Sequence, residues 1–346
     1  MQSKTSALTI PTENDPCKRS HAERLEFLSD SSPKDVDADK HKAWAEKMAA
    51  ALLAANLPKE AARVRDCAEA LFFHLLSDDN GEIHFKLHSA PYCKYRHCPI
   101  CQWRRSLRNK AIVMSALPAI LEKHPTARFA MLTLTVRNCY LSELRQTIRD
   151  MNKGWQRLIQ RKDWLALGWI RGVEVTRGQD GSAHPHFHAL LMLPSSYFSG
   201  QAYIPTREWV QLWRQAMRLD YDPVCHIRMV KAKVLAETTP EGTDGRLLAV
   251  QSAVSEVAKY ATKATDLLEG GPEWLAEYVE QVRSLKFLTS GGVLKGIFID
   301  QRPEQEDLVH VGGDEEDVDG AVVDRLAFHW RTSRKRYARK RTPATK

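Results

Sequence analysis

The sequence predicts an α+β protein, because stretches with helical spacing and short apolar strands are both present along the chain. Residues 129–136 alternate in polarity and are rich in strand-forming side chains. Residues 168–176 and 183–193 read as two further strands around the glycine-containing turn at 178–182, which indicates a hairpin. Between these strands, large apolar residues recur at helical spacing from 141 to 158 and predict a long amphipathic helix.

Composition narrows the classes of function. The 346 residues allow one large domain or two smaller ones, and 43% hydrophobic residues can form a core. The formal charge of +8 fits a polyanionic partner such as nucleic acid. No apolar run could span a bilayer and the N-terminus lacks a signal core, so we expect a cytoplasmic protein without a membrane partner. Clustering of three of the seven cysteines favours a metal site over disulfides.

We expect four regions. Residues 1–40 are polar and are predicted to be disordered. Residues 41–125 should hold helices, including one over 41–57 and one over 64–76, together with the clustered cysteines. Residues 126–300 should form the domain that carries the histidines. Residues 301–346 should be an acidic linker followed by a basic tail, which is either a nucleic-acid-binding arm or a solvated terminus.

The clustered cysteines form a candidate zinc knuckle. Cys93, Cys98 and Cys101 have a C-x4-C-x2-C spacing, from which three thiolates can converge on a tetrahedral ion. A fourth ligand is required, and the candidates are Cys67, His88 and His97. We favour Cys67, because a distant ligand would fix the preceding helix to the knuckle. The alternative is that these are ordinary buried cysteines.

Basic residues follow the knuckle on a predicted helix. They are either a face that contacts DNA phosphates or a solvated helix face. The candidates for DNA binding are Arg104, Arg105, Arg108 and Lys110.

Three histidines alternate along the strand at 183–193. Because side chains on a strand alternate between faces, His184, His186 and His188 should share one face, where imidazoles can bind a divalent cation. The predicted hairpin would bring Glu174 near His186 or His188. The alternatives are a hydrogen-bonded histidine patch and a surface carboxylate.

A second chemical cluster lies downstream. On a helix, Glu256, Tyr260 and Lys263 would lie on one side, because they are four and three residues apart. A carboxylate, a phenol and an ammonium group together could support phosphoryl transfer, with the phenol as the attacking group. By itself the pattern is more typical of an exposed helix face.

Taken together, these motifs resemble the replication initiators of rolling-circle plasmids that have a single catalytic tyrosine, a group within the HUH endonucleases. The resemblance covers about residues 60–300 and rests on the cysteines, the Leu-Thr-Leu-Thr strand, the histidine strand and the stretch 256–263. It implies a central antiparallel sheet of four to five strands flanked by helices, the HUH endonuclease fold, after an N-terminal helical region with the zinc knuckle.

The resemblance also implies roles for individual residues. His186 and His188 match a pair that binds Mg²⁺ or Mn²⁺, and His184 or Glu174 would complete that site. Zn²⁺ would occupy the cysteine knuckle.

Three further residues match positions that act on DNA. Tyr260 matches the nucleophile that leaves a 5′-phosphotyrosine and a free 3′-OH, and Lys263 matches the basic residue one turn later. Glu256 matches an acid that activates water in the closing step. The implied partners are plasmid origin DNA, single-stranded at the nick, with a host helicase and DNA polymerase.

Two other functions compete with this one. A single-strand transposase of the HUH class would often carry two neighbouring tyrosines, whereas Tyr260 has no tyrosine neighbour until Tyr278. A non-enzymatic zinc-dependent repressor would need the knuckle and the basic tail alone. Formation of a covalent adduct with DNA separates the repressor from both enzymes.

Overall fold

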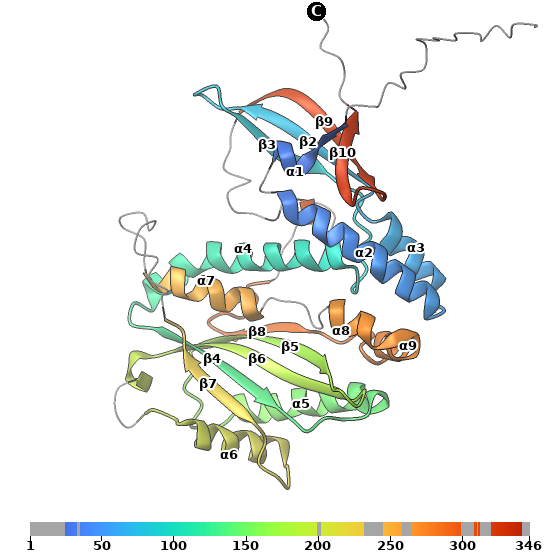
Figure 1. The fold of residues 1–346 in the computed structure, drawn as a ribbon. Coiled ribbons are helices and arrows are strands. Elements are labelled where there is room, and N and C mark those ends of the chain that lie inside the picture. The colour runs from blue at the N-terminus through green and yellow to red at the C-terminus, as the bar shows by residue number, and fades with distance from the viewer. Residues whose placement is uncertain are drawn as a thin grey trace, which may run out of the picture.

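A computed structural model describes residues 25–32, 35–198, 202–231, 245–257, 264–298, 308–309, 311 and 320–340. Within these ranges the chain forms two five-stranded antiparallel sheets, with helices between and beside them (Figure 1). The predicted α+β class is confirmed. The expected central sheet is present, and the second sheet was not predicted.

Sheet B carries the histidine strand. Its strand order is β7-β4-β6-β5-β8. The strands are β4 (Arg128–Thr135), β5 (Gly168–Arg177), β6 (Ala183–Leu193), β7 (Cys225–Met229) and β8 (Leu288–Gly292). Strand β6 is central because its odd and even positions are both buried beyond His188, so each face must be covered.

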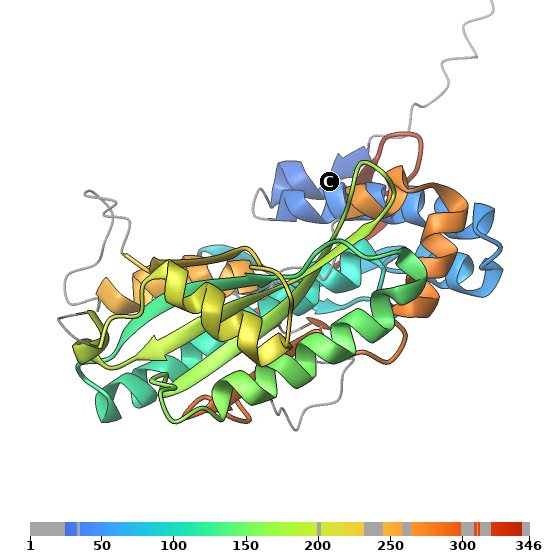
Figure 2. The same ribbon diagram turned by 90° about the horizontal axis from the view of Figure 1, so that it is seen from below.

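Helices cover both faces of sheet B (Figures 1 and 2). Helices α5 (Leu144–Ile159) and α6 (Thr206–Met217) cover the side to which Phe187 points, and Trp155 of α5 contacts the Phe187 ring. Helices α4 (Pro99–Lys123) and α7 (Gly245–Val257) cover the other side, where Leu190 and Met192 join a core with Val113 and Val254. The histidines have the same parity as Leu190, so they lie on the α7 side.

The remaining helical elements are shorter or lie nearer the N-terminus. They are α1 (Leu28–Ser31), α2 (Val36–Ala54), α3 (Pro58–Asp66), α8 (Ala264–Glu269), α9 (Gly271–Gln281) and the 3₁₀ turns Leu141–Glu143 and Ser195–Phe198. No helix in the described part of the chain has the length and apolarity needed to cross a bilayer.

Sheet A joins the two ends of the chain. Its order is β1-β10-β9-β2-β3. The strands are β1 (Leu25–Phe27), β2 (Ala70–Ser77), β3 (Ile83–Ser89), β9 (Ala321–Arg331) and β10 (Arg336–Lys340). Helix α2 lies on one side of sheet A and contacts α4. These two helices lie between the two sheets (Figure 1).

Sheet A corrects three sequence-based predictions. The predicted helix over 64–76 is wrong, because α3 ends at Asp66 and β2 follows. The apolar run 70–76 is too short for its periodicity to distinguish strand from helix, and Ala68 has a φ of 50° that interrupts the helix. Part of the expected disordered N-terminus, residues 25–32 and 35–40, is ordered as β1, α1 and the start of α2.

The third correction concerns the basic tail. Its residues 331–340 are not an extended tail, because they form the end of β9, the turn and β10. Tyr337 is buried and its hydroxyl donates to the Ala68 carbonyl. Long Arg and Lys stems can lie along a sheet while their charged ends reach water, so a basic composition did not exclude a strand.

Candidate functional site

The β5–β6 hairpin sets the geometry of the histidine site. Its turn is closed by Asp180, whose Oδ1 accepts the Ser182 backbone N–H at 3.0 Å, and by Gly181 at φ +83°. This turn fixes the register in which Glu174 lies directly opposite His186. Thr133 of β4 lies opposite His188 on the other side. The predicted hairpin and the proximity of Glu174 therefore follow from one turn.

Glu174, His186 and His188 form a three-residue cluster, which we call the triad. Glu174 Oε2 lies 3.4 Å from His186 Nε2 and 3.0 Å from His188 Nε2. All three side chains are largely buried, with 21%, 11% and 16% of their surface exposed. Burial by itself would raise the pKa of Glu174, but hydrogen bonds and charge from His186 and His188 hold it well below its ordinary value.

Hydrogen bonds on the far side of each ring orient the two imidazoles. His186 Nδ1 donates to the His184 carbonyl at 3.2 Å, and His188 Nδ1 lies 3.2 Å from Thr133 Oγ1. With its Nδ1 protonated, neutral His186 presents the Nε2 lone pair to the Glu174 oxygen. Two acceptors at this distance are favourable only with a cation or a proton between them, so the donor set fits a metal ion.

The separations within the triad fit common divalent ions. Cis ligands of an octahedral ion at about 2.1 Å lie about 3.0 Å apart. Ligands of a tetrahedral ion at about 2.0–2.1 Å lie about 3.3–3.4 Å apart. The triad distances of 3.0 and 3.4 Å cover both cases. Three protein ligands leave coordination positions open for substrate oxygens.

His184 lies outside the triad. Its ring is tilted against that of His186, with the centroids 5.4 Å apart. The ligand atoms that converge are those of Glu174, His186 and His188. Of the two third-ligand candidates, the structure therefore brings Glu174 into the cluster and leaves His184 beside it.

Glu256 reaches the triad from α7. Its Oε1 lies 3.9 Å from His188 Nδ1, and its Oε2 accepts a hydrogen bond from the Arg228 guanidinium of β7. Helix α7 approaches sheet B closely at Gly172, where a Cβ atom would lie 2.6 Å from the Val257 carbonyl oxygen. Glycine at 172 therefore permits the end of α7 to lie against the site.

Tyr260 and Lys263 lie outside the described residues, so their predicted positions are untested. Sequence reasoning also missed Arg228. Strand alternation assigns a side chain to a face, but it does not identify its partner on a helix elsewhere in the chain.

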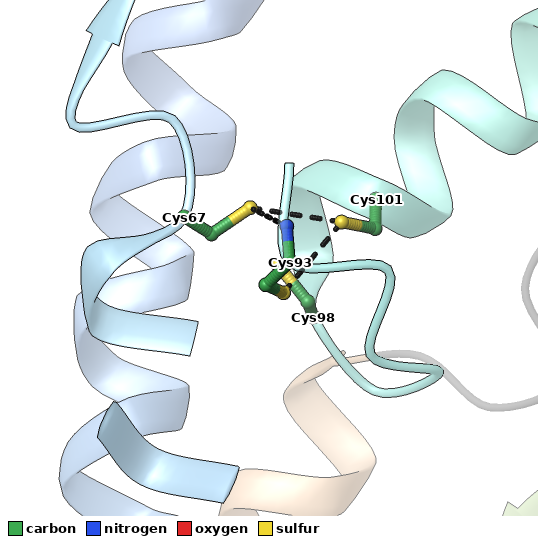
Figure 3. Close-up of side chains that lie close together, drawn as sticks. All are labelled: Cys67, Cys93, Cys98 and Cys101. Atoms are coloured by element: carbon green, nitrogen blue, oxygen red, sulfur yellow. Dashed lines mark hydrogen bonds between the residues drawn. The ribbon is translucent and has the colours of Figure 1, made fainter. Parts of the chain in front are cut away.

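The four cysteines also converge (Figure 3). Cys67 follows α3, Cys93 lies in the loop after β3, and Cys98 and Cys101 lie at the start of α4. Cys67 Sγ and Cys93 Sγ lie 3.6 and 3.7 Å from Cys101 Sγ. Sulfurs bound tetrahedrally at about 2.3 Å lie about 3.8 Å apart, so the cluster fits a zinc ion.

The cluster contains the cysteine favoured as fourth ligand and neither candidate histidine. His88 stacks on His74 in sheet A, at a centroid distance of 4.0 Å. His97 packs edge-on against Tyr95 and Tyr278.

A buried lysine supports the cluster, and sequence reasoning did not find it. Lys42 of α2 is 1% exposed, and its ammonium donates to the carbonyls of Cys67 and Arg65, both at 2.7 Å. It also pairs with Glu69 at 3.1 Å. The buried ammonium therefore holds the backbone on which Cys67 is carried.

The basic residues after the knuckle, which were predicted as candidates for DNA binding, differ in their exposure. Arg104 is 2% exposed and donates to the carbonyls of Leu308 and Val309. Arg105 donates to the Lys94 carbonyl. Arg104 is therefore a packing residue in this structure. The other three residues of the predicted face are half-buried: Arg105, Arg108 and Lys110.

Comparisons with known proteins agree with the motifs. A family model described as "Replication protein" matches residues 84–338. A protein rep of Lactiplantibacillus plantarum is 34% identical over 269 residues, covering 74% of this chain and 80% of that protein. A protein rep of Bacillus amyloliquefaciens is 34% identical over 296 residues, with 81% and 84% covered. A replication protein of Staphylococcus aureus is 32% identical over 232 residues, with 63% and 93% covered. No solved structure matches the chain.

Proposed function

Because this chain belongs to the replication protein family, we propose that it initiates rolling-circle replication of a plasmid by nicking one strand at the origin. The observation that carries the proposal is the triad, in which the ligand atoms of one carboxylate and two imidazoles converge. Three such ligands would leave coordination positions for substrate oxygens. Such a site suits an HUH endonuclease. A bound Mg²⁺ or Mn²⁺ would polarise the scissile phosphate.

The protein groups around the triad suit the two halves of the reaction. Tyr260 would attack the phosphorus, releasing a 3′-OH and leaving a 5′-phosphotyrosine. Tyr260 comes four positions after Glu256, and a segment of this length spans at most about 15 Å. This proximity in the chain to Glu256, which lies beside His188, is compatible with attack by Tyr260 on a phosphate bound at the triad. Lys263 would balance the charge on the phosphate.

Glu256 suits the closing step. Its carboxylate lies beside His188 and is paired with Arg228. From this position it could take a proton from a water molecule that attacks the phosphotyrosine, which releases Tyr260 and ends a round. A chain with one nucleophilic tyrosine needs such a group to finish replication without a second covalent step.

The cysteine cluster would hold Zn²⁺ as a structural ion. Four sulfur ligands leave no open position for chemistry, which is typical of structural zinc sites. The two metal sites would then have separate roles, the triad in catalysis and the cysteines in folding.

The experiment is covalent adduct formation on single-stranded oligonucleotides from the origin of its own replicon. We expect a protein–DNA band that requires Mg²⁺ or Mn²⁺ and that is lost in Tyr260→Phe. Tyr203→Phe is a matched control, because that tyrosine is 51% exposed before α6 and has no proposed role. Tight DNA binding without any adduct from the wild-type protein would instead favour the zinc-dependent repressor.

A further inference from the structure

The face of sheet A that points away from α2 is open. Along β2, Phe73 is 2% exposed and packs against Phe328 on the covered side, whereas Phe72 is 39% exposed on the other side. Helix α2 lies on the covered side of the sheet (Figure 1). There its Asp39 accepts the Tyr337 backbone N–H. Side chains with the parity of Phe72 therefore point away from α2, and in the middle of β2 they reach solvent, whereas Ala70 and Leu76 near its ends are buried.

Strand pairing identifies the residues of this open face. His74 lies opposite Arg325 on β9 and opposite Lys86 on β3, so these three share the face with Phe72. We call this set, together with the next outward-facing histidines, the outer face: Phe72, His74, Lys86, His88, Arg325 and His329.

The outer face has unopposed positive charge. Among the residues that the structure describes, Lys86 and Arg325 form no ion pair. On the neighbouring strand β10, by contrast, Arg336 pairs with Asp30 and Arg339 pairs with Glu26. None of the six residues of the outer face is a carboxylate. Farther along β3, His84 has the same parity as Lys86 and pairs with Asp78 at 3.0 Å. Cations left without carboxylate partners on one open surface fit a polyanion.

The face also offers flat rings. Phe72 is exposed, and the rings of His74 and His88 stack at 4.0 Å and 15°. Bases of a single strand can stack on such rings, and cations beside them can contact the backbone. A duplex hides the flat faces of its bases, and its grooves are read by a protruding helix or ribbon, which this flat sheet lacks.

We propose that the outer face binds single-stranded DNA, by phosphate contacts from Lys86 and Arg325 and by base stacking on Phe72 and the His74–His88 pair. It is a second DNA site, separated from the triad by α2, α4 and α7. The proposal rests on the proposed function in one respect: we take the single strand bound by the outer face to be the DNA that flanks the nick. Its location would let the protein hold DNA that the triad does not contact.

The test is fluorescence anisotropy of the full chain with labelled oligo(dT) of about 20 nucleotides and with a duplex of the same length. We expect Phe72→Ala to weaken oligo(dT) binding about tenfold. The slope of log K against log salt concentration should become less steep by about 1.4 in the double variant Lys86→Ala/Arg325→Ala. Each lost contact with a single-strand phosphate contributes about 0.7 to that slope. The matched control is Lys59→Ala/Arg334→Ala, which removes two exposed charges elsewhere.

Adduct formation on a short oligonucleotide that spans only the scissile step keeps the two proposals distinguishable. The outer-face variants should form this adduct at the wild-type rate. If they bind oligo(dT) like the control, or if they lose duplex binding alone, the proposal of a single-strand site is overturned. If the wild-type protein forms no adduct but the outer-face variants still lose oligo(dT) binding, the nicking function fails and the outer face stands.

Discussion

At the scale of single residues, Glu174 decides whether the triad can bind a cation. Glu174→Gln keeps the size of the side chain but removes the charge that lies 3.0 Å from His188 Nε2. We expect the affinity for Mn²⁺ to fall about tenfold or more, with a matching loss of nicking. Calorimetric titration with Mn²⁺ checks this, with Glu208→Gln on the exposed start of α6 as the control. Unchanged Mn²⁺ affinity in Glu174→Gln would remove that residue from the site.

Arg228 is the second residue with a separable effect. Its guanidinium holds the Glu256 carboxylate, whose other oxygen lies 3.9 Å from His188. Without Arg228, the carboxylate loses its orientation but the triad remains. We expect Arg228→Ala to form the covalent adduct normally and to slow its hydrolysis about tenfold, with a larger defect in Glu256→Ala.

The decay of purified adduct measures this hydrolysis directly. Arg128→Ala provides a control on the same sheet, because that guanidinium donates only to the adjacent Ala127 carbonyl among the described contacts. Normal hydrolysis in Arg228→Ala together with slow hydrolysis in Glu256→Ala would show that the ion pair has no role.

The sequence could predict the triad because hairpin register is a local property. A short turn and the period-two pattern are sufficient to place Glu174 beside the histidines. The cysteines were predictable because zinc restricts both ligand type and spacing. Lys42 and Arg228 were not predictable, since each contacts a segment brought near by tertiary packing.

At the scale of elements, the cysteine knuckle is fixed to the segment that follows α9. The Arg96 guanidinium donates to the carbonyls of Val282 and Leu285, at 2.8 and 2.7 Å, and stacks on Phe287. The Phe287 carbonyl in turn accepts the backbone N–H of Val173, next to Glu174. The knuckle therefore supports β5 of sheet B through the segment that leads from α9 to β8.

Removing that support should affect catalysis more than binding. We expect Arg96→Ala to lower the rate of adduct formation several-fold, because β5 carries Glu174, while the affinity for oligonucleotides changes little. Single-turnover rates and anisotropy measure the two quantities. Arg65→Ala, an exposed α3 residue paired with Asp66, is the control. A proportional loss of rate and affinity would indicate general unfolding instead.

Helix α2 is joined to the β9–β10 turn by one carboxylate. Glu46 accepts hydrogen bonds from Trp330 Nε1 at 2.7 Å and Thr332 Oγ1 at 2.8 Å, and it pairs with Lys335. Burial raises the pKa of Glu46, but these hydrogen bonds lower it by a larger amount. The net shift of the pKa is therefore downward from 4.5.

This downward pKa shift gives a sign for the pH dependence of stability. The contribution of Glu46 is fully present above the unfolded pKa of about 4.5 and is lost as pH falls through the lower folded value. We expect Glu46→Gln to lower the free energy of unfolding by about 1–2 kcal/mol at neutral pH, and this deficit should shrink in acid. Urea unfolding at neutral pH and below pH 4.5 measures the difference in the free energy of unfolding between the variant and the wild-type protein. Glu277→Gln, at an exposed position, is the control. A deficit that is independent of pH would contradict the charge-based explanation.

At the scale of the whole molecule, sheet A was beyond sequence reasoning. Strand β9 pairs with β2, and β10 pairs with β1, so the sheet joins segments from opposite ends of the chain. No local pattern encodes such pairing. The many Arg and Lys residues in 331–340 indicated a solvated tail, although Tyr337 among them is buried. Sheet B was easier because β5 and β6 are neighbours in sequence.

The cysteine cluster connects these two halves. Cys67 lies between α3 and β2 of the sheet A half, whereas Cys101 lies in α4, which packs against α7 over sheet B. A zinc ion there would contribute directly to folding. We expect Cys67→Ser to lose the bound zinc, about one ion per chain in the wild-type protein, and to lower the melting temperature by about 5–10 °C.

Elemental analysis and calorimetric melting check both expectations on the same samples. Cys139→Ser is the matched control, since Cys139 is half-buried near Ala183 and outside the cluster. If zinc links the halves, removing it should also reduce adduct formation, because α4 supports the sheet B core that includes Leu190 of the histidine strand. Full zinc content in Cys67→Ser would mean that another ligand completes the site. An unchanged melting temperature without zinc would mean that packing between α2 and α4 is sufficient to hold the two sheets together.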